Sequence, residues 1–383
     1  MDIHKIVEYV DSRHNEMLGF LEKLVNIDSG SYCIDGVRLV AQEVKKRLEK
    51  LDFKVELLSR GIWGPHLLGI REGKGDKKVL FIGHMDTVFD EGTALKRPFK
   101  IEGDKAYGPG VCDMKCGIVS LVYALESLIK NGFEDFGRLT VLLNSDEERG
   151  SLTSEKEIIR QALMADVVLV VEPSTPGGYV VIKRPGGGIF NLEIKGRASH
   201  AGAAPKDGIH AISELANKIQ ALHAITDYDI GSTVSVGVVK GGVRSNIIPD
   251  YAFAEIDLRV ATQAEGIRVM KQMEDICTSS TVPGAVCSFT KVMYRPPMEK
   301  TQGNIAAYST LKRAGEKLSL DIVERYSGGG TDGNYTSAVG IPTIDSMGPE
   351  GEGEHTEQEY ILIPSLYSRA KLISSFLIEN SAV

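Results

Sequence analysis

The sequence has no long apolar run, few cysteines and no excess of positive charge. No stretch of about 18 apolar residues occurs, and the opening MDIHKIVEYVDSRHNEM carries charges throughout, so we expect neither a membrane-spanning helix nor a signal peptide. The five cysteines are odd in number and scattered, which favours free thiols in a reducing compartment over a disulfide framework. We therefore expect a cytoplasmic protein without a membrane partner.

Positive charge is in the minority, since Lys and Arg number 44 against 52 Asp and Glu, for a net charge of -8. Because binding to nucleic acid depends on neutralising phosphates with Lys and Arg, nucleic acid is not an expected partner. The hydrophobic and charged fractions, 42% and 25%, are typical of a globular chain and exclude a disordered or fibrous one. A length of 383 residues favours two domains, since a single core stops growing near about 250 to 300 residues.

Short apolar strand patterns alternate with helical patterns in the first part of the chain. The runs KVLFIG (Lys78–Gly83), LTVLLN (Leu139–Asn144) and VVLVV (Val167–Val171) predict buried strands, and helical stretches separate them. This alternation indicates an α/β fold with a mostly parallel sheet. Polar residues gather where the strands end, which is the edge at which open α/β sheets place their sites.

A second pattern interrupts the first. After a loop-like stretch, residues from about Ile189 to Tyr294 follow the order strand, helix, strand, strand, helix, strand, which is typical of a ferredoxin-like α+β domain. The α/β alternation resumes after Arg295-Pro296-Pro297. We therefore predict a catalytic domain formed by residues 1–184 and 296–383, with a smaller domain inserted at 185–295.

Five segments place acidic or histidine side chains at a strand end or a helix start. They carry His84 with Asp86, Asp113, the pair Glu147 and Glu148, Glu172, and His355. Each one alone is most simply a polar surface residue or a helix cap, but their joint placement along one sheet favours a metal site. Carboxylates mixed with imidazoles suit zinc, and an Asp shared by two ions suits a paired hydrolytic site.

The adjacent pair Glu147 and Glu148 follows the strand LTVLLN. Neighbouring side chains at an extended strand end point in opposite directions, so one is expected to bind metal while the other faces the substrate as a base. In the His-x-Asp segment, Asp86 is expected to contact the imidazole of His84 and orient it without binding the metal itself.

A set of ordered motifs spans nearly the whole chain: GHMDTV, GDKAYGPGVCDMK, DEERGS, VEPS, GRASHAGAAP, SNIIPD and GGGTDGNY, followed by His355. With these motifs the sequence resembles the M20 family of metallopeptidases and amidohydrolases, and within it the glutamate carboxypeptidase (carboxypeptidase G2-like) branch. The resemblance implies a di-zinc α/β catalytic domain, interrupted by a ferredoxin-like domain that acts as a lid and forms a homodimer.

The resemblance also implies a metal-binding set. Asp113 bridges two Zn²⁺ ions, for which Co²⁺ or Mn²⁺ are possible substitutes. His84 and Glu172 complete one site, and Glu148 and His355 complete the other.

Three further residues receive catalytic roles from the resemblance. Glu147 is the general base that takes a proton from the attacking water and passes it to the leaving amine. Asp86 orients His84. His200, in RASHAG, reaches the active site of the partner subunit and stabilises the developing oxyanion.

Groups suited to holding a substrate carboxylate lie in or beside the inserted domain. Arg259 and Asn246 match the family's carboxylate-binding pair, although a surface ion pair on a strand is the alternative for Arg259. The glycine-rich loop supplies backbone donors near a helix start, and Arg295 matches the position that binds a glutamate side chain. The predicted set is Asn246, Arg259, Arg295, Gly329, Gly330 and Thr331.

The predicted function is a zinc-dependent hydrolase that cleaves an amide bond to release a C-terminal amino acid, with glutamate as one candidate, from a small peptide or N-acyl amino acid. One alternative is an N-acyl-amino-acid deacylase of the acetylornithine or succinyl-diaminopimelate type. An alternative of another class is a non-catalytic metal-binding or nucleotide-binding module. Glu147 argues against that module, because a purely structural metal needs no adjacent base.

Overall fold

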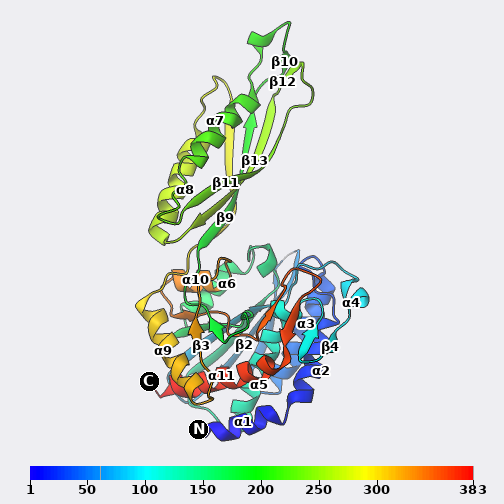
Figure 1. The fold of residues 1–383 in the computed structure, drawn as a ribbon, viewed down its shortest axis with the longest axis vertical. Helices are drawn as coiled ribbons and strands as arrows, with labels where there is room; N and C mark the ends of the chain where they lie inside the picture. The colour runs from blue at the N-terminus through cyan, green and yellow to red at the C-terminus, as the bar shows by residue number, and fades with distance from the viewer. Residues whose placement is uncertain (61, 383) are drawn as a thin grey trace. The chain divides into compact units, whose positions relative to one another are not determined.

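The computed structural model describes residues 1–60 and 62–382, so Gly61 and Val383, which fall in the predicted catalytic segments, lie outside it. The chain divides into two compact units (Figure 1). Unit 1 comprises Met1–Lys183, Lys300–Ser327 and Thr331–Val383, and unit 2 comprises Arg184–Glu299 and Gly328–Gly330. None of the helices described is both long and apolar enough to cross a membrane.

Unit 1 is built on a six-stranded sheet of order β1-β2-β6-β3-β7-β16. The strands β6, β3, β7 and β16 run parallel, whereas β1 and β2 add an antiparallel edge. The sheet is therefore mixed but mostly parallel, which confirms the predicted α/β class. The strand bounds are β1 (Lys54–Arg60), β2 (Trp63–Glu72), β3 (Lys78–His84), β6 (Arg138–Asn144), β7 (Val167–Val170) and β16 (Thr343–Ile344).

The apolar strand runs are explained by burial on both faces. On one face, Leu80 and Val168 belong to a core cluster with Ile158 of α6 (Glu155–Ala162) and Tyr335 of α10 (Gly333–Ala338). Three further helices, α3 (Ile34–Glu49), α5 (Cys116–Lys130) and α11 (Ile363–Ser381), pack together, with α3 also on β2. Two short helices, α1 (Ile3–Asp11) and α2 (His14–Val25), pack on α5. Helix α9 (Gln302–Glu316) packs on α11.

A small second sheet of order β17-β18-β5-β4 lies in the same unit. It is antiparallel and joins residues 100–107 to residues 351–362, which are far apart in the sequence. The sequence patterns did not predict it, because its strands have only two or three residues. Its bounds are β4 (Lys100–Glu102), β5 (Lys105–Tyr107), β17 (Gly351–Glu352) and β18 (Tyr360–Leu362).

Unit 2 has a four-stranded antiparallel sheet of order β11-β13-β9-β14. Its core side chains, such as Leu192, Leu215 and Met273, lie between the sheet and the helices α7 and α8. The main elements follow the predicted order strand, helix, strand, strand, helix, strand. They are β9 (Gly186–Lys195), α7 (Ala211–His223), β11 (Thr233–Gly241), β13 (Tyr251–Val260), α8 (Gln263–Thr278) and β14 (Val286–Arg295).

Within α7, Glu214 and Lys218 form a buried ion pair, and the same glutamate ties this helix to the loop that leaves α8. Glu214 is fully buried and lies 3.0 Å from the ammonium of Lys218. Its oxygens also accept the backbone N–H groups of Thr281 and Val282 at 3.0 and 2.6 Å. Burial alone would raise the pKa of Glu214, but these hydrogen bonds outweigh it and lower the pKa to about 2.

Replacing Glu214 with Gln should lower the free energy of unfolding of unit 2 by about 3 kcal/mol at pH 7, because Lys218 is left buried without its ion pair. The depressed pKa makes this stabilisation complete above the ordinary value of 4.5 and lost as the pH falls toward 2. Urea denaturation of both proteins at pH 7 and at pH 3 should therefore show a smaller difference at pH 3. Equal midpoints at pH 7 would contradict the structural role.

Candidate metal centre

Side chains from four separate segments meet at the carboxyl edge of the main sheet. His84 is the last residue of β3, and it pairs in register with Asn144 at the end of β6. Glu172 follows β7 by two residues, and Asp113 lies in the irregular turn η1 (Val111–Lys115) that precedes α5. The parallel strands therefore deliver their polar residues to one edge, as predicted.

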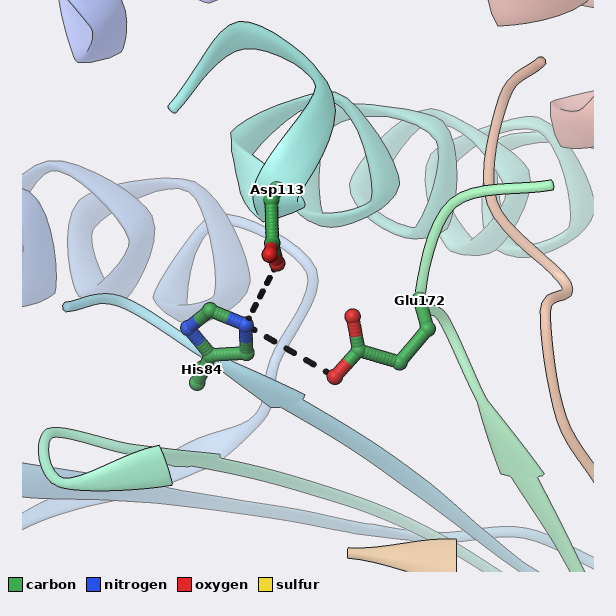
Figure 2. A group of neighbouring side chains, drawn as sticks. All are labelled: His84, Asp113 and Glu172. Atoms are coloured by element: carbon green, nitrogen blue, oxygen red, sulfur yellow. Dashed lines mark hydrogen bonds and ion pairs between the residues drawn. The ribbon is translucent and has the colours of Figure 1, made fainter. Parts of the chain in front are cut away.

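The first group consists of His84, Asp113 and Glu172 (Figure 2). The Nε2 atom of His84 lies 2.9 Å from Oδ1 of Asp113 and 3.6 Å from Oε1 of Glu172. The other ring nitrogen, Nδ1, lies 2.9 Å from the backbone oxygen of Asp86 and can donate to it. This donation fixes the proton on Nδ1 and leaves the lone pair of Nε2 facing the two carboxylates, as a metal ligand requires.

The second group consists of Asp113, Glu148 and His355. The Nε2 atom of His355 lies 3.2 Å from Oδ2 of Asp113 and 3.3 Å from Oε2 of Glu148. Asp113 thus offers one oxygen to each group. The backbone of His355 has φ of 63°, a left-handed conformation that costs a non-glycine residue about 1–2 kcal/mol.

The charge of this cluster suits bound cations. Asp113, Glu148 and Glu172 are three carboxylates in a largely buried site, and such a site is costly without compensating positive charge. Within the described chain, Oε1 of Glu148 is buried and has no hydrogen-bond partner. The donor set of imidazole and carboxylate groups, with an unused buried oxygen, fits two divalent ions of the zinc type.

The pKa shifts of these side chains reflect the same crowding of carboxylates. Burial raises the pKa of Glu172 and of Glu148, and repulsion from Asp113 adds to both shifts. Burial acts to raise the pKa of Asp113 too, but hydrogen bonds with His355 and His84 outweigh it and hold that pKa low. Hydrogen bonds to Asp113 and Glu148 raise the pKa of His355 to about 10. Asp113 is therefore the one carboxylate that stays charged most readily.

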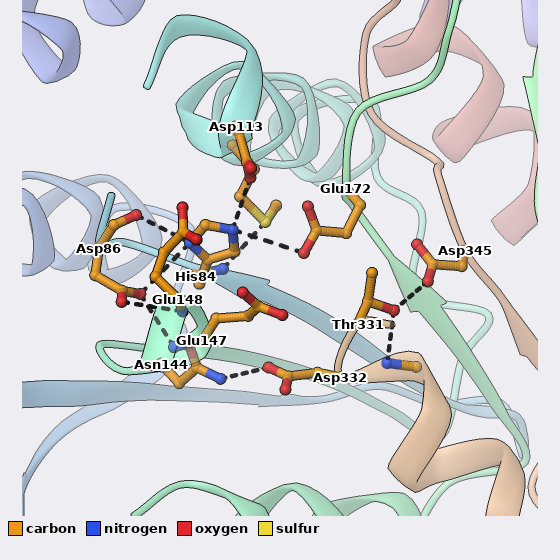
Figure 3. Close-up of polar contacts among 12 residues, drawn as sticks. His84, Asp86, Asp113, Asn144, Glu147, Glu148, Glu172, Thr331, Asp332 and Asp345 are labelled. Atoms are coloured by element: carbon orange, nitrogen blue, oxygen red, sulfur yellow. Dashed lines mark hydrogen bonds and ion pairs between the residues drawn. The ribbon is translucent and has the colours of Figure 1, made fainter. Parts of the chain in front are cut away.

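Glu147 and Glu148 lie on a 3-10 turn, η2 (Glu147–Arg149), and not on an extended strand end as expected. The reason is that buried Asp86 holds the turn, since its carboxylate accepts the backbone N–H groups of Glu147 and Glu148 at 3.2 and 3.3 Å. The two side chains nevertheless leave the turn in different directions (Figure 3). Glu148 joins the second metal-type group, whereas Glu147 belongs to neither group.

Asp86 touches His84 in two ways. Its backbone oxygen is the 2.9 Å partner of the ring, and its carboxylate Oδ1 lies at 3.4 Å from the same Nδ1. The hydroxyl of Ser31 donates to Oδ2 of Asp86 at 2.7 Å. One buried carboxylate therefore fixes the turn that carries Glu147 and Glu148 while it lies behind His84.

An open groove adjoins the second group in unit 1. It has a volume of about 520 Å³ and shares Glu148 with that group. Its walls come from residues 30–33, 87–91 and 148–149. A volume of this size is in the range of small-molecule sites.

Within unit 2, the structure brings His200 and Asn246 together. The short strands β10 (Ser199–His200) and β12 (Ile247–Ile248) pair, and the backbone oxygen of Asn246 accepts the N–H of Ala201 at 3.0 Å. The ring Nδ1 of His200 accepts two backbone N–H groups, from Gly202 at 3.2 Å and Ala203 at 3.1 Å. The neutral imidazole therefore carries its proton on Nε2, where it can donate outward without being charged.

The predicted carboxylate-binding arginines also lie in unit 2, in one register. Arg259 on β13 and Arg295 on β14 both align with Gly187 of β9. A side chain at Gly187 would meet the Arg259 guanidinium at 2.9 Å, so the glycine makes room for it. Arg259 forms a bidentate ion pair with Asp257, with both contacts at 3.0 Å, and Arg295 donates to the backbone oxygen of Gly330 at 3.2 Å.

The glycine-rich segment, residues 328–331, forms hydrogen bonds in both units. Arg184 donates to the backbone oxygen of Gly329 at 3.0 Å in unit 2. In unit 1, the hydroxyl of Thr331 donates to buried Asp345 (Figure 3). The N–H of Thr331 donates to the side chain of Asn334 at 3.0 Å. Both polar groups of Thr331 are therefore engaged in the fold.

Two buried acids were not singled out from the sequence. Asp332 accepts hydrogen bonds from Asn144 and Ser151 and so joins the glycine-rich segment to the end of β6. Glu359 accepts three backbone N–H groups around Asp113, and burial raises its pKa to about 7 against the effect of those bonds. The only sequence signal for Asp332 was its place in GGGTDGNY, and Glu359 had none beyond following His355 by four residues.

The chain is similar to known proteins over most of its length. Residues 80–379 match the model described as peptidase family M20/M25/M40. Carboxypeptidase G2 of Pseudomonas sp. (strain RS-16) is 36% identical over 365 residues, which cover 92% of this chain and 87% of that protein. The solved aminopeptidase PepT from Bacillus cereus ATCC 10987 matches with a TM-score of 0.77 at 23% identity, covering 97% of this chain and 99% of its own. The YXEP protein of Bacillus subtilis, a dinuclear metal binding peptidase, matches with a TM-score of 0.71 at 16% identity, covering 97% and 99%.

The two groups that share Asp113 predict a metal stoichiometry. The purified chain should hold two divalent ions, and Asp113→Ala should hold fewer than one, because it removes a ligand from both groups at once. Elemental analysis after dialysis measures both values. Glu357→Ala, an exposed glutamate in the segment of His355, is the control and should keep two ions. Fewer than one ion per chain in active wild-type protein would contradict the assignment.

Proposed function

Because this chain belongs to the M20/M25/M40 peptidase family, we propose that it is a two-zinc hydrolase that releases a C-terminal amino acid from a peptide or N-acyl amino acid. The membership of the M20 family that the motifs predicted is confirmed, and so is the prediction of a hydrolase. The alternative of a non-catalytic module is therefore not supported. The observation that carries the proposal is the sharing of Asp113 by two groups of metal-ligand type, with a separate buried glutamate, Glu147, on the adjoining turn.

In this proposal Asp113 would contribute a ligand to both ions, His84 and Glu172 would complete one site, and Glu148 and His355 would complete the other. When bound, the two ions supply Lewis-acid chemistry that polarises the scissile carbonyl and makes water a stronger acid. Glu147 belongs to neither group, and we assign it to accept a proton from the attacking water. The same carboxyl group then delivers that proton to the nitrogen of the leaving amine, which returns Glu147 to its starting state.

The substrate's two ends are assigned to different groups. Arg259 takes the free carboxylate of the released amino acid, in place of or alongside its present partner Asp257. Asn246 remains its proposed companion, and Arg295 and the segment Gly329 to Thr331 line the same region. The groove beside Glu148 has room for the acyl part. A glutamate side chain on the released residue is the specificity that Arg295 favours.

The internal geometry of unit 2 supports a homodimer. His200 pairs with Ile247 of β12, shortly before β13 begins at Tyr251. Arg259 lies near the other end of β13, about 27 Å from Tyr251 at the usual rise per residue. One copy of this rigid sheet therefore does not bring both groups to one amide bond. We propose that the Nε2–H group of the partner subunit's His200 donates a hydrogen bond to the oxyanion. The edge strand β11, with exposed Val238 and Val239, offers a surface for pairing between copies.

Hydrolysis of a panel tests the proposed activity. The zinc-loaded protein should release the C-terminal residue from N-acyl amino acids and dipeptides, with acidic residues favoured. Glu147→Gln should keep two metal ions and lose about 100- to 10,000-fold in kcat, because it removes only the base. Its control, Glu148→Gln, should lose metal as well. Release of N-terminal residues only, or metal loss in Glu147→Gln, would contradict the assignment.

Mixed subunits test the role of His200. His200→Ala should lower kcat by about 100- to 1,000-fold with little change in KM, because an oxyanion forms only in the transition state. Mixing inactive His200→Ala with inactive Glu147→Ala should restore up to about a quarter of wild-type activity after subunit exchange, since each mixed dimer has one intact site in two. Continued inactivity in verified mixed dimers would mean that His200 serves its own chain.

A further inference from the structure

A buried carboxylate next to the metal-type groups has no role in the mechanism above. Glu359, directly before β18, is 1% exposed. Its Oε1 accepts the backbone N–H groups of Cys112 and Asp113 at 2.8 and 2.9 Å, and its Oε2 accepts that of Gly110 at 2.9 Å. One side chain thus satisfies three backbone donors of the loop that presents Asp113.

That loop cannot hold its own shape with regular backbone hydrogen bonds. Inside it, Asp113 (φ −106°, ψ 97°) and Met114 (φ −131°, ψ 36°) depart from helical angles. The N–H of Lys115 spans the loop to the oxygen of Gly110 at 3.0 Å. Backbone N–H groups that converge in this way form a concavity for an anion, and Glu359 fills it.

Residues 355–359 contact both the side chain and the backbone of Asp113. Four residues before Glu359, His355 contacts Oδ2 of the Asp113 carboxylate at 3.2 Å. Glu359 bonds to the backbone N–H of that same aspartate. Residues 355–359 therefore fix the Cα position of Asp113 and the direction of its carboxylate together. The pairing of Tyr360 with Tyr107 anchors this segment beside the start of the loop.

The hydrogen-bond pattern requires a carboxylate and not merely a polar side chain of the same size. Both oxygens act only as acceptors here, whereas a glutamine would turn an NH₂ group toward an N–H donor. Placing another negative group near Asp113 carries a cost in repulsion and desolvation, which charge-assisted hydrogen bonds offset in part. A simple loop cap would not need to be an acid at this position.

We propose that Glu359 is a positioning residue that fixes Asp113 between the two metal sites and thereby sets the metal affinity of both. This inference rests on the two-metal site of the proposed function. It differs from a role in folding alone, because it predicts weaker binding at two sites that Glu359 itself does not touch. Loss of such an outer partner typically costs about 10- to 100-fold in metal affinity or activity.

Metal titration of the full chain tests the proposal. Metal-free wild type and Glu359→Gln are titrated with Zn²⁺ against a competing chelator, and with Co²⁺ while the visible absorption of the bound ion is recorded. In Glu359→Gln both binding steps should weaken by about 10- to 100-fold, and the Co²⁺ spectrum should change because the ligand geometry changes. Glu359→Asp keeps both acceptors on a shorter chain and should shift in the same direction, which covers a Gln variant that does not fold.

Glu214→Gln is the matched control. Glu214 is also a buried glutamate that accepts backbone N–H groups, but it lies in unit 2 and outside both metal-type groups. Its variant should be less stable and bind metal like wild type. Wild-type affinity and spectrum in a folded Glu359 variant would overturn the positioning role alone. A wild-type chain that takes up no metal would overturn the two-metal proposal and this inference with it.

Discussion

The arrangement of the candidate metal centre depends on three carboxylates that are largely buried at one edge of the main sheet. Among the described residues, the groups that contain Asp113, Glu148 and Glu172 include two histidines, so the cluster is short of positive charge. Every element nearby can be understood as holding these groups in place. Parallel strands end in His84 and lead to Glu172, the carboxylate of Asp86 holds the turn of Glu148, and residues 355–359 hold Asp113. Two divalent cations are the compensation that the donor atoms suit.

Much of this could be predicted from the sequence, because its signals are local. A run such as KVLFIG is apolar at every position since both faces of β3 are covered, and a polar residue that follows such a run must lie at the sheet edge. The pattern therefore places His84 and Glu172 correctly without knowledge of the neighbours. The alternation of strand and helix gave the α/β class, and the motifs gave the M20 family.

What could not be predicted depends on contacts between distant segments. Glu359 reaches a loop nearly 250 positions earlier in the chain, and no periodicity marks it. The turn of Glu147 and Glu148 was expected to be extended, because nothing local to that segment reveals that Asp86 caps its N–H groups. The small sheet that joins β5 to β18 was missed for the same reason. The members of the two metal-type groups were thus visible in the sequence, while most of the residues that hold them were not.

The central claim, that Asp113 lies between two bound metals, is tested most directly by X-ray diffraction at the zinc absorption edge from crystals of the metal-loaded protein. We predict two anomalous peaks separated by roughly 3.5–4 Å, one beside His84 and Glu172 and the other beside Glu148 and His355, with one oxygen of Asp113 directed at each. A single peak, or two peaks that Asp113 does not bridge, would contradict it.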